Sequence, residues 1–568
     1  MYDERSKRYI ILLRSWFMKK CCSFFLGISL FLSIQFLHAQ FAADPNDSIY
    51  QDLSLWEGKG ILRHLPALRP YPPQVILDAL ERVVQRGSRS DAEKAKAYLE
   101  EYQKSYRIHL EAGGSSRYTG DDFYGDLYGK IEAGGWIGES MHLEGRLEGL
   151  VMDNTSGFVL PEGQRTSVDI FDTWADVTVK DRKLNLRQSQ VVDFSVGKTD
   201  IYFKAGIERN SFGPFWDDSV VLSPEAPHAG HYSFVWRNSW FSYTTVLLEL
   251  AATDYINDTD NDTYMENEKF PDKHLVLQSF NFYPTSWLEM GFFETIVWGG
   301  RFDLIYLLPF KELFYAQSMA GFNDNSFMGL LANVRIKDSF QIPLLVYVDD
   351  TNLNDLLQFD FSTKFKVALQ VGAKYTPKEG GILRRIGADY LLVTPYMYTH
   401  RSGLEEIKTD ADARFSQLSA PNYTNYTHMG TNLGVGLDPN SDRFTLSVQL
   451  EPIKNLTVDI RGRLMRHGNA SEAMSDDERD ERNDGSILDD GYNKYGKAIF
   501  HYNTRFLNQS VIEKVWQAGF NASYRIPLGP GAVLLEGGYT FEYWEDKDLV
   551  KGRTDTTHYI NVGLGYRF

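Results

Sequence analysis

Residues 558–568 read His-Tyr-Ile-Asn-Val-Gly-Leu-Gly-Tyr-Arg-Phe, and this stretch decides the fold class. Apolar side chains alternate there with polar or small ones at every step, up to the last residue. Successive side chains of a β-strand point to opposite faces, so the stretch predicts a strand with one apolar and one polar face. The apolar face carries Ile560, Val562, Leu564, Tyr566 and Phe568.

The aromatic end of this strand narrows the class of protein. A strand that ends on Phe568, with Tyr566 two residues earlier, resembles the C-terminal signal by which bacterial outer-membrane β-barrels are handed to their insertion machinery. The alternative is the terminal strand of an ordinary β-sandwich. A sandwich exposes its polar faces to bulk water, whereas a membrane barrel lines a wet lumen with them and turns its apolar faces to lipid.

Strands with the same alternation recur from Tyr106 onward, and the lengths of their connections favour the barrel. Outer-membrane barrels have short periplasmic turns and long outer loops. If the C-terminus is periplasmic, the connections counted backwards from it are alternately long and short as far as the first strand. This count gives about 18 strands, and such barrels have an even number of strands. We expect 401–442 to be one long outer excursion and 181–198 to be an unusually long inner turn. The other inner turns fall near 137–140, 238–241, 284–287, 337–339, 377–384, 451–455 and 527–531.

The first residues read as a secretory signal peptide, expected over 1–39. It has a positive start, an apolar run at 24–37 and a small residue, Ala39, before the expected cleavage site. Met18 is an alternative start, because the residues before it add nothing that a leader needs. A membrane anchor is the other interpretation, although the apolar run is short for one.

Residues 40–104 read as a small periplasmic α-helical segment or plug, and residues 105–568 as the barrel. Apolar residues repeat at helical spacing over 75–83, and Ser90 can cap a second helix. Two short helices cannot bury a core alone, so we expect them to pack against the barrel. The prediction is therefore an all-β fold: a closed antiparallel transmembrane β-barrel of about 18 strands with an N-terminal helical periplasmic segment.

Composition excludes several classes of function. The chain has 568 residues and a formal net charge of −17, which disfavours nucleic acid as a partner. Its two cysteines, Cys21 and Cys22, lie inside the expected leader, so the mature chain has no disulfide framework, zinc–thiolate site or cysteine nucleophile. No G-x-S-x-G or H-E-x-x-H motif is present, so we expect no enzyme, with an outer-membrane lipid hydrolase as the least favoured alternative.

One expected outer segment mixes aromatic and imidazole side chains. Aromatic planes stack on the C–H faces of sugar rings while polar neighbours bond the hydroxyl groups, so the composition suggests a glycan-binding surface. The alternative is that these residues are interfacial aromatics and loop packing. The candidates are Trp216, His228, His231, Tyr232 and Trp236.

Asp258, Asp260 and Asp262 alternate in another expected outer loop. Hard oxygen ligands at this spacing can hold Ca²⁺, the only cofactor we consider, although the turn glycine of an EF-hand is replaced by Thr263. The alternative is a solvated acidic loop.

Charged residues on the expected inner face of the C-terminal strands would line the lumen. They could form a selectivity lining, or an ion-paired network that fills a plugged barrel. These residues are Asp459, Arg461, Arg463, Glu536 and Glu542.

Short segments in a fixed order carry a further resemblance. They are Asp52-Leu53 through Arg69-Pro70-Tyr71, Gly206 with Gly213-Pro214, Val221 to Pro227, Asp324-Asn325 with Gly329, Asp349-Asp350, Pro395 to His400, and Gly436 to Asp442. Together they resemble the Wzi-type capsule-assembly proteins of the outer membrane.

This resemblance implies an 18-stranded barrel that is closed by a periplasmic helical part. It also implies a non-enzymatic role in the assembly or attachment of surface polysaccharide, bound through outer loops. The strongly acidic loops of this chain depart from the family, which puts any shared glycan in doubt. The expected partners are outer-membrane lipid, surface polysaccharide and the barrel-insertion machinery, and we expect a monomer. The alternative function is a porin-like diffusion channel, suggested by the charged inner face.

Overall fold

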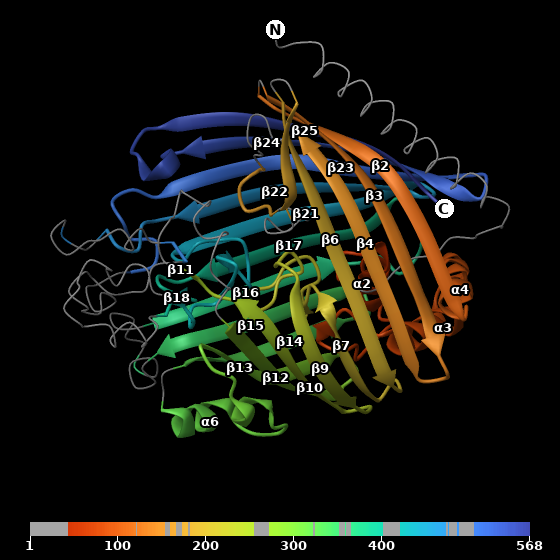
Figure 1. Ribbon diagram of the computed structural model, residues 1–568, viewed down its shortest axis with the longest axis horizontal. Coiled ribbons are helices and arrows are strands. Elements are labelled where there is room, and N and C mark those ends of the chain that lie inside the picture. Colours follow the sequence, from red (N-terminus) through yellow and green to blue (C-terminus); the bar gives the residue numbers. More distant parts are fainter. Residues whose placement is uncertain are drawn as a thin grey trace, which may run out of the picture.

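The computed structural model describes residues 44–120, 122–153, 160–165, 173–179, 182–254, 272–321, 324–351, 358, 365–400, 421–472, 475, 486–487 and 505–568. Most of these residues form a closed antiparallel β-barrel of 18 strands, which confirms the predicted fold class (Figure 1). The strands of the ring are β2 (Tyr106–Thr119), β3 (Asp122–Ile137), β4 (Met141–Asp153), β6 (Arg182–Gly197), β7 (Ile201–Glu208), β9 (Ala229–Arg237), β10 (Phe241–Ala251), β12 (Asp272–Thr285), β13 (Leu288–Gly299), β14 (Asn325–Ile336), β15 (Phe340–Thr351), β16 (Phe365–Tyr375), β17 (Leu383–Val393), β21 (Ser441–Ile453), β22 (Leu456–His467), β23 (Glu513–Leu528), β24 (Gly531–Glu545) and β25 (Thr554–Arg567).

The last strand closes the ring against the first. Arg567 of β25 lies opposite Glu111 of β2, and Tyr559 lies opposite Thr119. Just beyond, the N–H of Phe568 donates to the carbonyl of Leu110 at 2.9 Å, and the Leu110 N–H donates back at 2.8 Å. A ring has no free edge, so its strands leave no row of backbone groups unpaired in lipid. The closure rules out the β-sandwich alternative.

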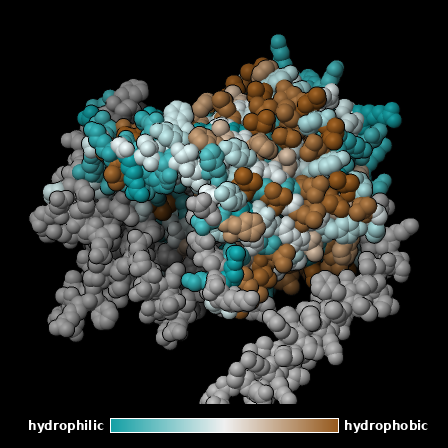
Figure 2. All heavy atoms as spheres, turned by 90° about the horizontal axis from the view of Figure 1, so that it is seen from above, coloured by the Kyte–Doolittle hydropathy of each residue, from teal (hydrophilic) through white to brown (hydrophobic). Residues whose placement is uncertain are grey.

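The outer surface of the ring is apolar along its middle. At every second position of each strand the side chain points away from the interior, and large hydrophobic side chains at these positions are exposed. Leu127, for example, is 68% exposed and Leu564 is 59% exposed. Figure 2 shows apolar side chains gathered over the barrel wall between hydrophilic regions at its two ends. This belt is the surface that a transmembrane barrel presents to lipid.

One predicted inner turn is wrong. The expected turn at 181–198 is the spanning strand β6, which pairs with β4 from Leu184 to Val196. Its short turn lies after Gly197, before β7 begins at Ile201. A further strand, β5 (Thr173–Val179), pairs only with the first part of β6. The outward face of β6 carries Gln188 and Gln190, which interrupt the apolar alternation by which the other strands were predicted.

The region 401–442, predicted as one long outer excursion, has no spanning strand over its described residues 421–440, and its last two residues begin β21. It holds the short pairs β18 (Pro421–Asn422), β19 (Thr427–His428) and β20 (Thr431–Asn432), and β21 begins the next crossing. The number of strands therefore stays even. We refer to the two ends of the barrel as the long-loop end and the short-turn end.

Between residue 44 and the first strand lie three helices: α2 (Ser48–Gly58), α3 (Pro73–Arg86) and α4 (Arg89–Tyr102). Pro73 occupies the first turn of α3, and the Ser88 hydroxyl caps α4 by accepting from the Asp91 N–H at 3.2 Å. Apolar side chains of all three helices share one buried core. We call residues 44–104 the helical plug. No helix in the described parts of the chain is long and apolar enough to cross a membrane.

The helical plug is held at the short-turn end of the barrel (Figure 1). The Gln74 side chain donates to the carbonyl of Ser140 in the β3–β4 turn at 3.1 Å, and Arg63 pairs with Asp338 in the β14–β15 turn at 2.7 Å. Deeper inside, Glu57 pairs with Arg335 of β14 at 2.5 Å. These contacts fit the prediction that the helices pack against the barrel. The predicted leader lies outside the described residues.

Candidate functional site

The connection between β7 and β9, residues 209–228, turns into the barrel from the long-loop end, and we call it the inward segment. It carries β8 (Ser211–Phe212), which pairs with β1 (Leu68–Arg69) of the helical plug. The Arg69 guanidinium donates to the carbonyl of Phe215 at 2.7 Å. The inward segment, which enters from the long-loop end, and the helical plug, which enters from the short-turn end, therefore meet inside the barrel.

A second group of residues from the long-loop end packs onto the inward segment. Tyr398 donates its hydroxyl to the carbonyl of Val220 at 2.6 Å, and Tyr426 donates to the carbonyl of Val221 at 2.9 Å. Their rings stack at 5.5 Å between centroids. The two hydrogen bonds satisfy buried backbone carbonyls that no strand pairs.

These segments and the inner faces of the strands share one apolar core. A barrel of this size would leave an aqueous channel if its interior were not filled by other parts of the chain. Here the interior is filled over much of its cross-section. The core includes Phe212, Phe215, Val220, Val221, Leu222, Phe293, Phe327, Tyr347, Tyr398, Tyr426, Leu433 and Val435.

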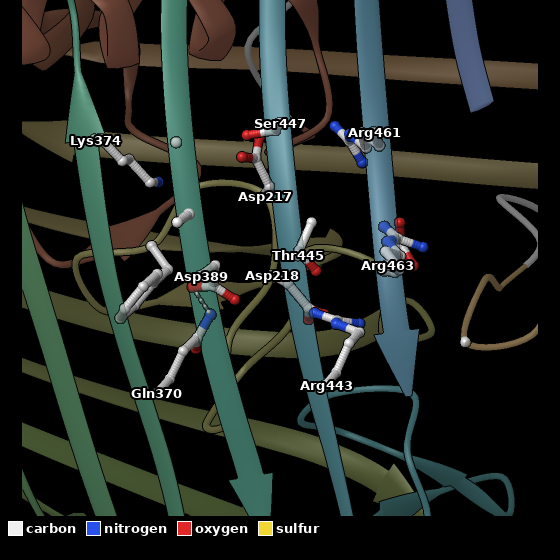
Figure 3. A pocket seen from close by; sticks show the side chains of 15 residues that line it. Asp217, Asp218, Gln370, Lys374, Asp389, Arg443, Thr445, Ser447, Arg461 and Arg463 are labelled. Carbon is white, nitrogen blue, oxygen red and sulfur yellow. Dashed lines mark hydrogen bonds and ion pairs between the residues drawn. The ribbon is translucent and has the colours of Figure 1, made fainter. Parts of the chain in front are cut away.

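Beside this core lies a small polar cavity of about 60 Å³, which we call the luminal chamber (Figure 3). A volume of this kind holds a few water molecules or one small polar group. Its walls come from the inward segment and from the inner faces of β16, β17, β21 and β22. The lining residues are Gly163, Phe215, Asp217, Asp218, Glu225, Gln370, Lys374, Gly387, Ala388, Asp389, Arg443, Thr445, Ser447, Arg461 and Arg463.

Two carboxylates of the inward segment enter this chamber. Asp218 pairs with Arg443 at 2.7 Å. Burial favours the neutral form of Asp218, but Arg443, together with Arg165 and the Ser223 hydroxyl, holds the pKa of that carboxyl below its usual value. Burial is likewise outweighed at Asp217, where Arg385 and then Lys374 hold the pKa well below the usual range. Both groups are therefore anions that attach the inward segment to a cationic wall.

Three other cations of the chamber are not held by a carboxylate among the described residues, and Lys374 Nζ instead lies 5.6 Å from the ring centre of Phe215. Lys374, Arg461 and Arg463 make no ion pair within 4.0 Å among the described residues. The Arg463 Nε is buried there without a hydrogen-bond partner. Since an unpaired cation in a confined site attracts an anion or a hydroxyl oxygen, this wall can receive a polar group from a ligand.

The five residues predicted as a glycan surface do not come together. Trp216 lies inside the barrel and donates its indole N–H to Glu57 of the plug at 2.9 Å. His231 is buried on the inner face of β9, whereas Tyr232 and Trp236 are exposed on its outer face, toward lipid. His228 accepts at its carbonyl from His428 at 2.9 Å. Period-two alternation along β9 already separates His231 from the two aromatics.

The five residues predicted to line the lumen all lie on inward parities of their strands. Arg461 and Arg463 line the luminal chamber, and Asp459 accepts from Gln449 at 3.1 Å. Glu542 is buried and accepts from Gln517 at 2.7 Å. Glu536 is exposed to the interior.

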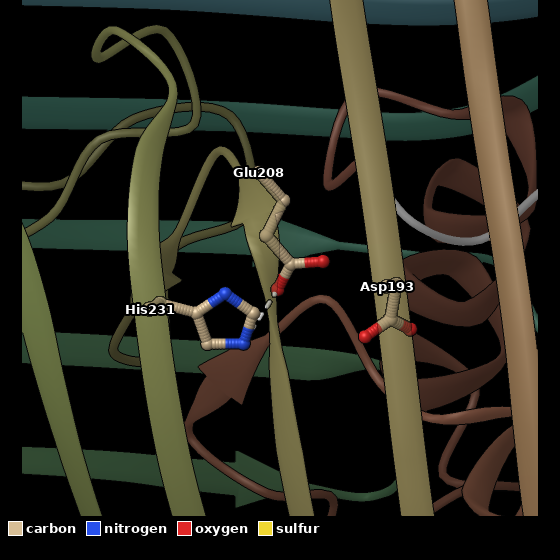
Figure 4. A group of neighbouring side chains, drawn as sticks. All are labelled: Asp193, Glu208 and His231. Carbon is tan, nitrogen blue, oxygen red and sulfur yellow. Dashed lines mark ion pairs between the residues drawn. The ribbon is translucent and has the colours of Figure 1, made fainter.

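The predicted calcium ligands Asp258, Asp260 and Asp262 lie outside the described residues. Elsewhere, Asp193, Glu208 and His231 bring ligand atoms within 4.8 Å of one another (Figure 4). Lys204 already supplies the positive charge there, because its Nζ is 2.7 Å from Glu208 and 3.4 Å from Asp193. This cluster is therefore an internal ion network. Sequence reasoning missed it because three different strands bring it together.

Comparison with solved structures supports the fold. The chain is similar to Wzi, an outer membrane protein involved in group 1 capsule assembly in Escherichia coli and described as a carbohydrate-binding β-barrel, with a TM-score of 0.55 and 12% identity over 94% of this chain and 99% of that one. Pseudomonas aeruginosa OprD aligns with a TM-score of 0.39 and 10% identity over 82% of this chain and 95% of that one. P. aeruginosa OccD3 (OpdP) aligns with a TM-score of 0.41 and 10% identity over 82% of this chain and 91% of that one. No protein-family model and no curated protein matches the sequence.

Proposed function

We propose that this protein is a non-enzymatic barrel of the bacterial outer membrane that takes part in the assembly or attachment of surface polysaccharide. The apolar belt would lie in outer-membrane lipid, the helical plug would face the periplasm, and the long-loop end would meet the polysaccharide outside. The fold it shares with Wzi, a carbohydrate-binding barrel, supports this proposal.

The observation that carries the proposal is the filled interior. A diffusion channel needs a continuous wet path from one mouth to the other. In this barrel the helical plug occupies the short-turn end, and the inward segment crosses the interior to pair with β1 of the plug. An apolar core then fills the space around that junction. Such a barrel favours a surface for binding over a pore for transport.

The luminal chamber would add a polar contact to this surface. Its unpaired Arg461 and Arg463 suit a carboxylate or hydroxyl substituent of a sugar, since guanidinium groups bind planar anions well. A cavity of about 60 Å³ cannot admit a sugar chain, so most of the polysaccharide would stay outside the barrel.

Binding of the purified full chain to surface polysaccharide from its own bacterium tests the proposal. We expect saturable binding in detergent solution by calorimetry. For an acidic polysaccharide, the double variant Arg461→Gln/Arg463→Gln should weaken binding by about tenfold or more, because a charge-assisted hydrogen bond contributes about 1.5–3 kcal/mol. Arg466→Gln is the matched control, because Arg466 lies on the same strand but already pairs with Asp442 at 2.5 Å. Absence of binding to every surface polysaccharide of the host would contradict the proposal.

A small-solute channel is the second candidate, and one observation favours it. Arg461, Asn521, Ser523 and Glu536 face the interior on neighbouring strands and remain exposed, so part of the lumen beside the core is wet. Conductance across planar bilayers separates the candidates. Stable open steps from the full chain would support the channel, and a silent bilayer would support the closed, binding barrel.

A further inference from the structure

The connection between β13 and β14 leaves the long-loop end and folds back over the outside of the barrel wall (Figure 1). It contains the 3₁₀-helix η2 (Leu304–Leu307) and the helix α6 (Leu313–Ala320). Arg301 and Asp324 pair at 2.5 Å where the connection begins and ends. We call residues 302–320 the outer-wall strap.

The strap is docked on the lipid-facing side of the strands. Tyr306, Leu313 and Ala316 of the strap form one buried apolar cluster with wall residues of β10, β12 and β13. The wall residues of that cluster, which are Leu247, Val276, Ile296 and Trp298, share the outward parity of their strands. Phe310 stacks on outward-facing Tyr243 of β10 at 4.2 Å.

Three of the polar side chains on this outward face, where a transmembrane barrel normally carries apolar ones, bond the backbone of the strap. Glu294 and Gln278 are each only 2% exposed, and the strap covers both. Glu294 accepts from the N–H of Leu313 at 3.0 Å, and Gln278 donates to the carbonyl of Lys311. The hydroxyl of Tyr243 accepts from the N–H of Phe310 at 3.1 Å.

Two of these bonds fall on the irregular backbone between η2 and α6, at Phe310 and Lys311, and the third falls on the first residue of α6, Leu313. Backbone groups of such a stretch cannot be left unpaired in hydrocarbon, where each would cost several kcal/mol. The wall supplies partners to the non-helical backbone at Phe310 and Lys311, and to the free N–H of Leu313 where α6 begins. This arrangement meets the condition under which irregular backbone is tolerated at membrane depth.

The uncovered side chains of the strap are mostly apolar, and Glu312 and Ser318 are the exposed polar ones. Leu304 is 68% exposed and Met319 is 66% exposed, and they are joined by Phe302, Leu308, Phe310, Phe314 and Tyr315. This face continues into the apolar belt, because Phe310 meets the exposed belt residue Trp236 edge-on at 6.0 Å.

We propose that the outer-wall strap is embedded in the membrane, with its exposed face in contact with lipid acyl chains. Its apolar face extends the belt, and the wall satisfies its polar backbone. Because removing apolar surface from water is favourable in proportion to its area, seven large exposed apolar side chains favour lipid over water as the neighbour. The proposal concerns the membrane surface and stands whether or not the protein binds polysaccharide.

Spin-label accessibility in vesicles of phosphatidylcholine tests the proposal. Nitroxides are placed by Leu308→Cys and Met319→Cys in the full chain, with Cys21→Ser and Cys22→Ser to remove the native thiols. Leu330→Cys serves as the lipid control on the belt, and Val550→Cys as the water control in the β24–β25 connection. We expect the strap labels to collide more with oxygen than with a water-soluble nickel complex, as at Leu330, and the opposite order at Val550.

Two results would overturn the proposal. Ready collision of the strap labels with the nickel complex would place this face in water. Protection from both relaxants, with spin–spin broadening between copies, would show that a second copy of the chain covers the face in place of lipid. All the labelled side chains are exposed, so the cysteine substitutions and nitroxides should not disturb folding. Collision rates and spin–spin broadening are therefore both measured in folded protein.

Discussion

Asp91 is the residue around which the helical plug is assembled. Its buried carboxylate accepts from Lys59 Nζ at 2.8 Å and from the indole N–H of Trp56 at 3.0 Å, so it connects α4 to α2 and to the end of that helix. The Ser88 hydroxyl, which caps α4, also donates to this carboxylate at 2.7 Å. The Asp91 carboxylate therefore links the N-terminal cap of α4 to the C-terminal end of α2.

Asp91→Asn should destabilise the helical plug by about 3–5 kcal/mol, because it leaves the buried ammonium of Lys59 without a counter-charge. Faster amide hydrogen exchange in α2 and α4 would report the loss. Glu93→Gln is the matched control on the same helix, since the exposed Arg89–Glu93 pair contributes about 1 kcal/mol or less. Equal amide hydrogen exchange in the two variants would show that the Asp91 carboxylate does not hold α2 and α4 together.

The same residue predicts how plug stability depends on pH. Burial favours the neutral acid, but Lys59 and Ser88 outweigh it and lower the pKa of Asp91 below its ordinary value of 3.8. A lowered pKa stabilises the folded plug in full above that value, and the stabilisation is lost as the pH falls through the folded pKa. Fluorescence of Trp56 should change with a midpoint below 3.8, and this transition should be absent from Asp91→Asn. A midpoint at or above 3.8 would contradict the assignment.

At the scale of elements, the strands could be predicted where the outward face is uninterrupted. The alternation from Ile560 to Phe568 predicts β25, and in the structure this strand closes the ring by pairing with β2. Strand β6 was missed because Gln188 and Gln190 stand on its outward face. The inward segment was read as an outer loop because its packing depends on partners far along the chain, such as Tyr398 against Val220. No local pattern carries that information.

The outward face of β25 supplies a prediction about the belt. Leu564→Arg should destabilise the barrel by about 2–4 kcal/mol in lipid vesicles, because a cation would then face the hydrocarbon layer. Val550→Arg, in the exposed β24–β25 connection, should change stability by no more than about 0.5 kcal/mol. Reversible urea unfolding in vesicles, followed by heat-modifiable gel migration, measures both. Similar losses from the two variants would mean that Leu564 does not face lipid.

For the whole molecule, the proposed closure of the lumen depends on contact between the helical plug and the inward segment, which enter the barrel from opposite ends. The helical plug reaches the inward segment through Arg69, whose guanidinium donates to the carbonyls of Gly213 and Phe215 and lies 4.6 Å from the ring centre of Trp216. Removing that side chain would leave buried carbonyls unpaired and loosen the junction without touching the barrel wall. Under the proposed function, closure of the lumen therefore depends on the junction between the two ends rather than on either end alone.

Arg69→Ala should convert a silent barrel into one with intermittent conductance in planar bilayers, because water can then enter between β1 and β8. Arg63→Ala is the control: Arg63 also belongs to the plug, but it pairs with Asp338 at the rim and should leave the bilayer silent. Equal conductance in the two variants would mean that the rim, and not the central junction, closes the barrel. Stable open steps from the unaltered chain would contradict the closed barrel itself, and the wet wall near Glu536 would then be the path for solute.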